Sequence, residues 1–413
     1  MQRVSTPAAR LNRFNGIASE TLLSEVNEAA EKIRGLRVIH VNATAQGGGV
    51  AEILKSLVPL MRDVGIDTEW YALPPDESFF SISKTLHHCL QGGSCLPDVA
   101  DINTYRTFNE KAVDSLKSMG ITADLWFIHD AQVLPMLSYM NSSKGVWVCH
   151  VDTTESADGV KEMLFPYMSR YHRVIASMPE YFPNGNNPAE VVVIPPAIDP
   201  LQPKHQKMSC QRARQIIAEL GLDTTHPIIS QVSRFDKWKD PWGVVDAYRL
   251  ARKDIPELQL AFLGAMTAKD DYDAYEILEN LQDYCGDDSD IHIFHDPRQI
   301  GDREVNAFQT GADIILQKSI REGFGLTVAE AMWKEKPLIG GNCGGIKHQI
   351  KDGQTGFLVN NTSECAERII TLLKNPVLAK KMGSAGRESV RNKYLMPRLL
   401  RDYLHLASDL MMS

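Results

Sequence analysis

Short apolar runs alternate with longer amphipathic segments along most of the chain. In the first half, runs rich in β-branched residues lie at 36–41, 67–73, 123–128, 144–149, 173–176 and 191–194. Helical periodicity occupies the intervals, for example at 50–64 and 103–119. Strands that are apolar throughout are typical of parallel sheets covered by helices on both faces. The pattern therefore predicts a doubly wound parallel sheet of the α/β class.

Proline interrupts this alternation near the middle of the chain. The segment IPPAIDP, at 194–200, contains three prolines, which exclude both a helix interior and a central strand. The alternation then starts again, with strand candidates at 227–233, 258–264, 291–295, 312–317, 337–340 and 356–359. We therefore expect one domain at 1–194 and a second at 201–390, joined by a linker at 195–200.

The last segment, 391–413, has the periodicity of a helix. The pair Met396-Pro397 interrupts it, because proline has no backbone N–H and favours the first turn of a new helix. We expect the helix that follows to cross back to the N-terminal domain.

Length and composition support two folded domains and exclude several other classes. With 413 residues, 43% of them hydrophobic, the chain is too long for one ordinary core and too apolar to be disordered. Its 44 Lys and Arg against 52 Asp and Glu give a formal charge of -8, so nucleic acid is not an expected partner. Neither a signal-peptide core nor an apolar run of about 18 residues is present, and we expect a cytoplasmic protein without membrane contact.

Possible metal ligands do not have the spacing of a known site. The seven cysteines are scattered, with no C-x-x-C pair, and are expected to be reduced thiols. The acidic runs 269–273 and 287–290 lack the frame of a calcium loop. One further cluster lacks the two ligand pairs of a structural zinc site: His87, His88, Cys89 and Cys95. We expect no resident metal ion.

A glycine-rich loop follows the first predicted strand and begins the first predicted helix. Backbone N–H groups of Gly47, Gly48 and Gly49 can approach a phosphate there, and the helix dipole favours an anion. The spacing matches neither a G-x-G-x-x-G loop nor a P-loop. By itself the loop is equally compatible with a plain tight turn.

A basic turn follows the first strand of the second half. Arg234 and Lys239 come after the strand at 227–233, at the edge where open α/β sheets bind ligands. An arginine fork and a lysine ammonium can together hold a diphosphate. The alternative is a solvated basic loop, and the turn alone does not decide between them.

A third element, REGFGLTVAEAM, runs from a strand into a helix and contains Glu322 and Glu330. The N–H groups of Leu326, Thr327 and Val328 are expected to be the unpaired donors of the new helix. The close turn before them is made by Gly323, Phe324 and Gly325. One carboxylate for hexose hydroxyls, amides for phosphate and one carboxylate for a ribose diol would suit a sugar nucleotide.

These three elements together resemble those of retaining glycosyltransferases of family 4. The E-x7-E pattern, the R-x4-K pattern and the glycine loop each have a counterpart in that family, and the resemblance covers nearly the whole chain. Runs such as HVNATAQGGGVAEIL, QVSRFDKWKD and GGIKHQI are most similar to its trehalose-forming members. Pro196-Ala197 stands where many other relatives have asparagine-glycine. The resemblance implies the GT-B fold, with two doubly wound, Rossmann-like domains facing across a cleft.

The resemblance also implies a reaction and its substrates. Glucose would pass, with retention, from a nucleoside diphosphate glucose such as UDP-glucose or ADP-glucose to free glucose, giving trehalose in a reversible reaction. The donor is a substrate, no cofactor is expected to be tightly bound, and any Mg²⁺ would come with the nucleotide. A homodimer is the default assembly, because closed two-fold dimers are the commonest.

Site roles follow from the resemblance residue by residue. Arg234 and Lys239 are expected to hold the donor diphosphate, Glu322 the hexose 3-hydroxyl and Glu330 the ribose. Positioning and charge stabilisation would carry the catalysis, since the chain has no G-x-S-x-G nucleophile elbow.

In the N-terminal domain, Gly48 and Gly49 are expected to face the phosphates. Asp130 and His150 follow predicted strands and would contact the transferred sugar and the acceptor. His129, beside Asp130, is equally compatible with a packed or capping residue.

Three alternatives stay open at this stage. A trehalose phosphorylase of the same fold would use phosphate in place of a nucleotide, and another family 4 enzyme would use an acceptor such as a sugar phosphate or glycerate. A non-catalytic sensor of sugar nucleotides would bind the donor without forming product.

Overall fold

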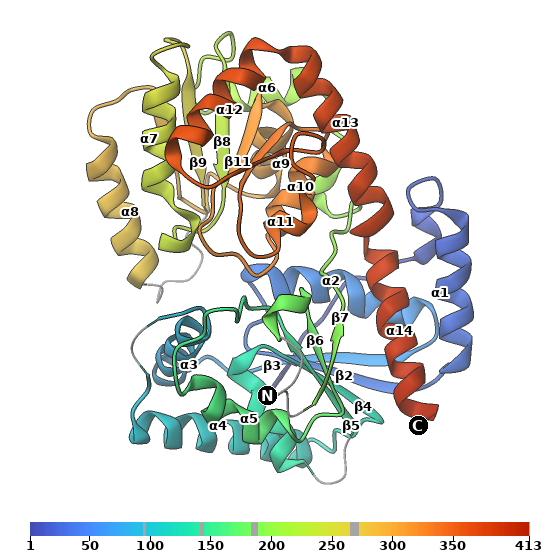
Figure 1. Ribbon diagram of the computed structural model, residues 1–413. Coiled ribbons are helices and arrows are strands. Elements are labelled where there is room, and N and C mark those ends of the chain that lie inside the picture. Colours follow the sequence, from blue (N-terminus) through green and yellow to red (C-terminus); the bar gives the residue numbers. More distant parts are fainter. Residues whose placement is uncertain (94–95, 141–143, 183–188, 265–271, 413) are drawn as a thin grey trace. The chain divides into compact units, whose positions relative to one another are not determined.

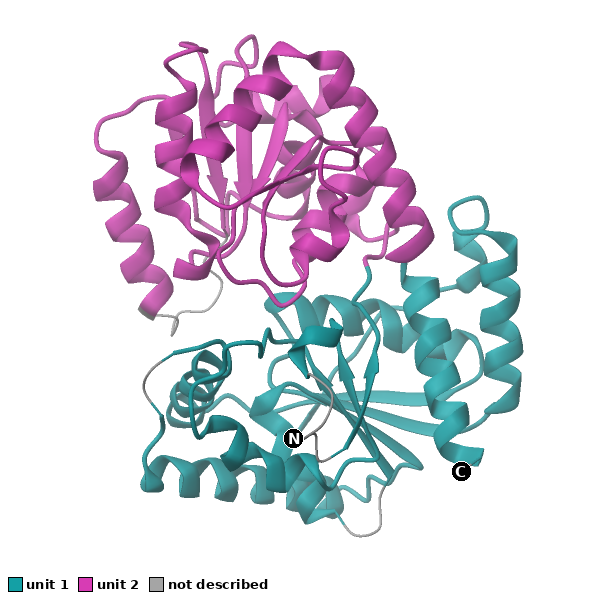
Figure 2. Ribbon diagram, viewed as in Figure 1, with its two compact units in different colours: residues 1–197, 395–413 teal, residues 198–394 magenta. Residues whose placement is uncertain are grey.

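The computed structural model describes residues 1–93, 96–140, 144–182, 189–264 and 272–412. The chain forms two compact units, drawn in Figures 1 and 2. Unit 1 comprises residues 1–197 and 395–413, and unit 2 comprises residues 198–394. The unit borders lie close to the borders predicted from the proline-rich segment and from the helix break at Pro397.

Unit 1 is built on a seven-stranded sheet in the order β1-β3-β2-β4-β5-β6-β7. Its strands are β1 (Gln2–Arg3), β2 (Arg37–Asn42), β3 (Asp67–Ala72), β4 (Leu125–His129), β5 (Lys144–Cys149), β6 (Arg173–Ala176) and β7 (Glu190–Val193). Strand β1 pairs antiparallel with β3, and every other pairing is parallel. Central strands such as β4 are buried along their whole length, as expected for a sheet covered on both faces.

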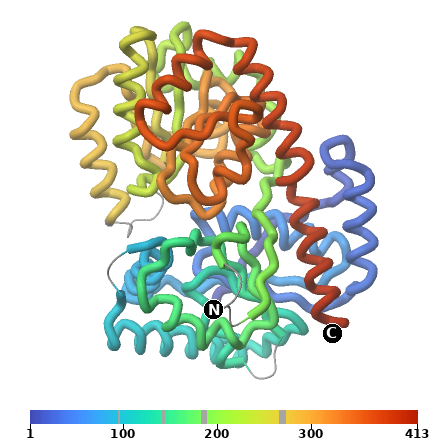
Figure 3. Tube along the Cα trace, viewed as in Figure 1, coloured from blue at the N-terminus to red at the C-terminus, as the bar shows by residue number. Residues whose placement is uncertain are grey.

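The helices of unit 1 come from both ends of the chain. They are α1 (Glu20–Lys32), α2 (Gly48–Asp63), α3 (Glu77–Leu90), α4 (Val99–Ser118), α5 (Val160–Met168) and α14 (Met396–Met412), with short 3₁₀ segments η1 (Leu11–Phe14), η2 (Ala131–Tyr139) and η3 (Pro179–Tyr181). Figure 3 shows α14, in red, alongside the blue α1. The buried guanidinium of Arg398 donates to the carbonyl oxygens of Pro195 and Pro196 at 2.7 and 2.9 Å, which fixes the start of α14 against the proline-rich segment.

Unit 2 contains a six-stranded, fully parallel sheet in the order β10-β9-β8-β11-β12-β13. Its strands are β8 (Ile228–Val232), β9 (Gln259–Leu263), β10 (Ile291–Phe294), β11 (Ile314–Gln317), β12 (Leu338–Gly341) and β13 (Phe357–Val359). Its helices are α6 (Cys210–Glu219), α7 (Pro241–Ala251), α8 (Tyr272–Cys285), α9 (Asp302–Gly311), α10 (Leu326–Trp333), α11 (Ile346–Gln349), α12 (Thr362–Lys374) and α13 (Pro376–Lys393), with 3₁₀ segments η4 (Pro203–His205) and η5 (Lys237–Lys239). Part of the core lies between the sheet and α7 and α12, where Tyr248 and Ile369 are fully buried.

The strand order of each sheet creates one switch point. In unit 1 the chain leaves β2 for β3 on one side and returns to β4 on the other; in unit 2 it leaves β8 for β9 and β10 and returns to β11. Loops that diverge at such a point leave a crevice at the carboxyl ends of the strands, where open α/β sheets bind their ligands. The glycine loop and Asp130 follow β2 and β4, whereas the basic turn and the E-x7-E element follow β8 and β11.

Two further findings concern the described part of the chain. None of its helices combines the length and the apolar character needed to span a membrane. None of the six cysteines in the described residues forms a disulfide, and Cys95 lies outside those residues, as do three positions of the acidic run 269–273. In the other acidic run, Asp288 and Asp290 pair with Arg252, the residue that follows α7.

Candidate functional site

The basic turn of unit 2 is held at its C-terminal end by partly buried polar contacts. Gln231, at the end of β8, donates from Nε2 to the carbonyl oxygen of Lys239 at 3.1 Å. Asp240 then adopts a left-handed conformation, with φ of 48°, and its carboxylate accepts from the N–H of Gly243 at 3.2 Å. The same carboxylate forms an ion pair with Lys318, which follows β11. The two loops at the switch point are thus tied together.

Lys239 and Glu322 meet at this point. Their side chains form an ion pair, and both are largely buried, with 16% and 13% of their surface exposed. Glu322 Oε2 also lies 3.3 Å from the Ser319 hydroxyl and 3.4 Å from Gln317 Nε2. The structure therefore brings the lysine of the R-x4-K pattern and the first glutamate of the E-x7-E pattern together.

Arg234 remains exposed at the start of the basic turn. Its side chain is 63% exposed, and its guanidinium lies 3.6 Å from the carboxylate of Asp236. A guanidinium in this position is accessible to an anionic ligand.

The glycine turn of unit 2 is packed against a second glycine-rich loop. Gly325 has a φ of +83° and caps α10, while Gln349 Nε2 donates to the carbonyl oxygens of Phe324 and Gly325 at 2.6 and 3.2 Å. A Cβ at Gly345 would lie 2.5 Å from the Cα of Phe324, so the close approach of the two loops requires glycine there. Phe324 itself is buried, and the turn has a defined shape.

The first amides of α10 differ in part from the expectation. Val328 donates its N–H to the carbonyl oxygen of Gly325 at 3.0 Å, so the expectation of an unpaired amide is wrong at this position. The turn closes on itself one residue earlier than an ideal α-helix would, as helix ends often do. Leu326 and Thr327 form the first turn, and the Thr327 hydroxyl donates to Gln317 Oε1 at 2.9 Å.

Glu330 is not an open carboxylate in this structure. It is buried, Lys204 Nζ lies 2.8 Å from its Oε1, and Gln309 Nε2 donates to its Oε2 at 3.0 Å. Burial acts to raise the pKa of Glu330, but the nearby cations, Lys204 first, outweigh it and lower that pKa. Lys334 lies in the same network, and burial lowers its pKa to about 7.

Lys204 belongs to η4 and was not found from the sequence. The segment QPKHQ has no recognisable pattern, and the lysine becomes significant only because the fold places it on Glu330.

In unit 1 the glycine loop forms the start of α2. Gly47 and Gly48 have φ angles of 74° and 76°, a region that other residues rarely adopt, and Gly49 lies in the first helical turn. A Cβ at Gly48 would meet no atom within 4 Å, so the backbone angle rather than space requires glycine there. The loop presents helix N-terminal amides at the switch point of the sheet.

Asp130 has a strained backbone at the end of β4. Its φ of 66° and ψ of 174° fall in a region used almost only by glycine. Three contacts hold it: its N–H donates to Val148 O at 2.8 Å, its carbonyl oxygen accepts from Trp147 Nε1 at 3.0 Å, and its carboxylate accepts from the N–H of His150 at 3.0 Å. Strain of this kind is common at functional sites.

His150 is the outermost of three linked imidazoles. His129 Nδ1 lies 3.1 Å from His150 Nε2, and His129 Nε2 lies 3.0 Å from His40 Nδ1. Burial, with a smaller effect of Arg62, lowers the pKa of His40 to about 3, and burial next to the other two imidazoles places the pKa of His129 well below its ordinary value. Burial also lowers the pKa of His150, although the Asp130 carboxylate opposes it.

His129 is therefore a packed residue that also contacts a predicted site residue. No sequence pattern singles out His40, since it lies in the middle of an apolar strand. The available signal was that β2, β4 and β5 all carry a histidine in or directly after an apolar run.

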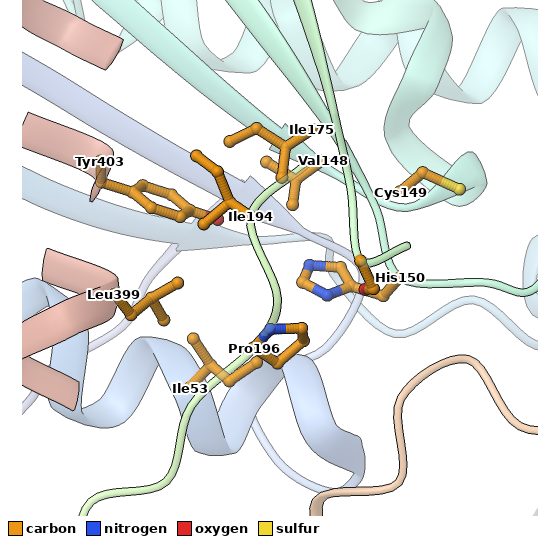
Figure 4. Close-up of a pocket in the computed structure, with 10 residues that line it drawn as sticks. Ile53, Val148, Cys149, His150, Ile175, Ile194, Pro196, Leu399 and Tyr403 are labelled. Carbon is orange, nitrogen blue, oxygen red and sulfur yellow. The ribbon is translucent and has the colours of Figure 1, made fainter. Parts of the chain in front are cut away.

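A small pocket in unit 1 adjoins His150. Figure 4 shows His150 at one end of the pocket and Leu399 and Tyr403, from α14, at the other. Pro196 of the proline-rich segment and Ile53 of α2 complete the wall between them. The last helix thus contributes directly to the surroundings of His150.

Comparisons with known proteins agree for both halves of the chain. The family profile described as "Trehalose synthase, N-terminal domain" matches residues 40–183, and that described as "Glycosyl transferases group 1" matches residues 213–389. The trehalose synthase of Rubrobacter xylanophilus is 40% identical over 415 residues, which cover 100% of this chain and 99% of that protein. The trehalose synthase of Pyrococcus horikoshii is 38% identical over 416 residues, 99% of each chain.

Among solved structures, a sucrose-phosphate synthase from Thermosynechococcus elongatus matches with a TM-score of 0.72. The match covers 91% of this chain and 99% of that one at 18% sequence identity, so it bears on the fold alone. It confirms the α/β class and the GT-B fold expected from the sequence.

Proposed function

The chain belongs to the trehalose synthase family of glycosyltransferases, and from this premise we propose that it makes trehalose from a nucleoside diphosphate glucose and free glucose. The transfer retains the configuration of the glucose, and the reaction runs in both directions. UDP, ADP or GDP is the leaving group.

The observation that carries this proposal is the meeting of Lys239 and Glu322 at the switch point of unit 2. An ammonium there can stabilise the charge that grows on the departing diphosphate, with the exposed Arg234 as a second cation. The carboxylate beside it can accept hydrogen bonds from hexose hydroxyls. Binding of the donor would loosen the ion pair, because diphosphate and Glu322 compete for the same ammonium.

Glu330 enters the proposal in a changed role. The carboxylate of Glu330 already contacts Lys204 and Gln309. It can therefore accept a hydrogen bond from a ribose hydroxyl only in addition to these two contacts. The network then fixes the position of the carboxylate before the nucleotide binds.

The charge of unit 1 supports an uncharged acceptor. The segments that follow β2 to β7 at the switch-point edge contain no lysine or arginine: 43–47, 73–76, 130, 150–159, 177–178 and 194–197. They do contain the acids Asp76, Asp130, Asp152, Glu155 and Asp158. An edge with this charge suits a neutral sugar better than a sugar phosphate or glycerate.

The two carboxylates of the E-x7-E element do not act as the acid and nucleophile of a glycosidase. One is paired with Lys239 and the other is held in the network with Lys204, so neither is arranged to attack or protonate the sugar. Positioning of the two sugars and stabilisation of the leaving group carry the catalysis.

The proposal is tested by the reverse reaction. Purified protein is incubated with trehalose and, in separate reactions, with UDP, ADP, GDP or inorganic phosphate, each with and without Mg²⁺, and products are identified by mass. A nucleoside diphosphate glucose supports the proposal and identifies the base. Glucose 1-phosphate from the phosphate reaction would identify a phosphorylase instead, and binding of nucleotide without any product would identify a sensor.

A further inference from the structure

The three histidines of unit 1 form a continuous column across neighbouring strands. His40, His129 and His150 come from β2, from the end of β4 and from the residue after β5, which lie side by side in the sheet. The planes of successive rings are inclined by 29° and 13°, with centroids 5.3 and 5.4 Å apart. Phe127 and Tyr403 stack on His40, with centroids 5.0 and 6.3 Å away, and shield the inner end of the column.

Hydrogen bonds along such a column must all run in the same direction. A neutral imidazole has one N–H donor and one acceptor nitrogen, so a ring that donates through one nitrogen accepts through the other. His40 and His129 are completely buried, which favours their neutral forms. The tautomer of the innermost ring therefore determines the tautomers of the other two.

Met61 of α2 selects the tautomer of that ring. Its Sδ lies 3.4 Å from His40 Nε2, and a thioether sulfur can accept a hydrogen bond but has no proton to donate. The proton of His40 is therefore on Nε2, and its Nδ1 accepts from His129 Nε2. His129 Nδ1 in turn accepts from His150 Nε2, which leaves His150 Nδ1 unprotonated.

We propose that Met61, His40 and His129 are positioning residues that hold His150 as its Nε2–H tautomer, with Nδ1 directed to accept a hydrogen bond from a substrate hydroxyl. Among the described residues, none forms a hydrogen bond with His150 Nδ1. The inference rests on the proposed function, since it assigns a sugar hydroxyl as the hydrogen-bond donor to His150 Nδ1. The opposite tautomer would present an N–H at the same place and would select a different hydroxyl orientation.

The tautomers can be measured directly by NMR. In the full-length protein labelled with ¹⁵N-histidine, long-range ¹H–¹⁵N correlations distinguish a protonated from an unprotonated ring nitrogen. We expect His40, His129 and His150 all to be protonated at Nε2 alone at neutral pH. A His150 signal from the Nδ1–H form, or one averaged between the two forms, would overturn the proposal.

Two substitutions with the same side-chain branching and number of heavy atoms compare a site that has a hydrogen-bond acceptor with a site that has none. In His40→Asn the side-chain carbonyl can occupy the position of Nδ1 and accept from His129, whereas His40→Leu offers no acceptor. We expect His40→Asn to retain the Nε2–H form of His150 and a kcat/KM close to wild type. We expect His40→Leu to mix the tautomers and to lower kcat/KM by about 3- to 10-fold, the range of one lost hydrogen bond.

Met61→Leu tests the same step at the edge of the column and with little change of volume. Removal of the acceptor should make the two directions nearly equal, so His150 should show averaged nitrogen shifts in a folded protein. An unchanged His150 tautomer in Met61→Leu would contradict the relay, meaning the control of the His150 tautomer by Met61 through His40 and His129. Equal effects of the two His40 variants would contradict it as well. If a His40 variant does not fold, the result for Met61→Leu decides alone. The tautomers do not depend on turnover, so a protein with the expected tautomers but no glucosyl transfer would refute the proposed function and leave the relay intact.

Discussion

The two units place candidate site residues at equivalent edges of similar sheets, yet with opposite electrostatic designs. In unit 2 the residues are charged and arranged in pairs of opposite sign: Lys239 with Glu322, Lys318 with Asp240 and Lys204 with Glu330. In unit 1 the equivalent edge has a column of neutral imidazoles and a strained aspartate. The same topology therefore supports two different kinds of ligand recognition.

The difference corresponds to the two parts of the proposed substrates. A diphosphate that becomes more negative during the reaction needs cations whose positions are already fixed, and ion pairs with buried carboxylates hold them in place. A neutral sugar needs directed hydrogen bonds, and imidazoles of defined tautomer supply them without a net charge. Variants that remove a buried ion pair of unit 2 or an imidazole of unit 1 should therefore differ in their effects on stability and turnover.

The largest effect is expected from the buried network of unit 2. Glu330→Gln leaves Lys204 and Lys334 without their carboxylate, and breaking a buried pair on one side costs about 3–5 kcal/mol. The matched control is Glu335→Gln, which removes an exposed partner of Arg387 and should cost less than about 1 kcal/mol. Denaturant unfolding measures both, and equal midpoints for the two variants would show that the network does not stabilise unit 2.

The next effect concerns turnover. Lys239→Met should lower kcat/KM by about 10²- to 10³-fold, the usual cost of losing one group that stabilises developing charge. Lys237→Met is the control, because that lysine lies on the same turn but is exposed and rests over the ring of Trp238. If both variants lose activity to the same extent, turnover depends on the total positive charge of the turn and not on the specific pair of Lys239 with Glu322.

A smaller effect is expected from pH on the stability of the folded protein. The pH range of this effect differs between the two units. The pKa of His40 is about 3 when folded against 6.5 ordinarily, so below pH 6.5 the unfolded chain binds a proton that the folded chain does not. Stability should therefore fall as the pH drops below about 6.5, by up to about 1.4 kcal/mol per pH unit for each such group. For Glu330 the folded pKa is lowered, so its contribution is retained down to its ordinary pKa of 4.5 and is lost below it.

Unfolding curves between about pH 4 and 6 check this expectation. His40→Asn should make the pH dependence less steep, because one proton-binding group is removed, while His405→Asn, on the exposed face of α14, serves as the control. An unchanged slope in His40→Asn would mean that His40 does not resist protonation in the folded protein.

The smallest change in stability is expected at Asp130. In Asp130→Gly, relief of about 1–3 kcal/mol of backbone strain opposes the loss of one hydrogen bond, about 1 kcal/mol, and the added flexibility of glycine, about 0.5–1 kcal/mol. The net change should lie within about 1 kcal/mol, while trehalose formation should decrease clearly. Asp130→Asn retains an acceptor for the N–H of His150 and is the comparison; wild-type kinetics in Asp130→Gly would exclude a role of this side chain.

The sequence was sufficient to predict much of the fold, because strand interiors are apolar throughout. The runs at 144–149 and 173–176 coincide with β5 and β6, and the break at Met396-Pro397 separates α13 from α14. Most other strand borders shifted by one or two residues, since apolar runs extend beyond the paired backbone. Strand β1, with only Gln2 and Arg3, has no apolar pattern and is defined solely by its pairing with β3.

From the sequence, the candidate site could be predicted within each loop but not the contacts between residues of different loops. The motifs placed Lys239 and Glu322 at the same edge of one sheet, but their contact joins residues 83 positions apart and depends on strand order. Lys204, Met61 and His40 were missed for the same reason, because the role of each depends on contact with a residue in another helix or strand. Val328 was predicted wrongly, since a local 3₁₀ turn satisfies its amide.

The return of α14 to unit 1 has a consequence for the order in which the chain folds during synthesis. Unit 1 is interrupted in sequence, whereas unit 2 is continuous from 198 to 394. The apolar faces of α1 and α2 that α14 covers, with Leu400, Tyr403 and Leu404 among its buried side chains, stay uncovered until those residues leave the ribosome. Unit 2 can therefore complete its core first, although unit 1 begins the chain, and in that interval the uncovered apolar faces of unit 1 are open to aggregation.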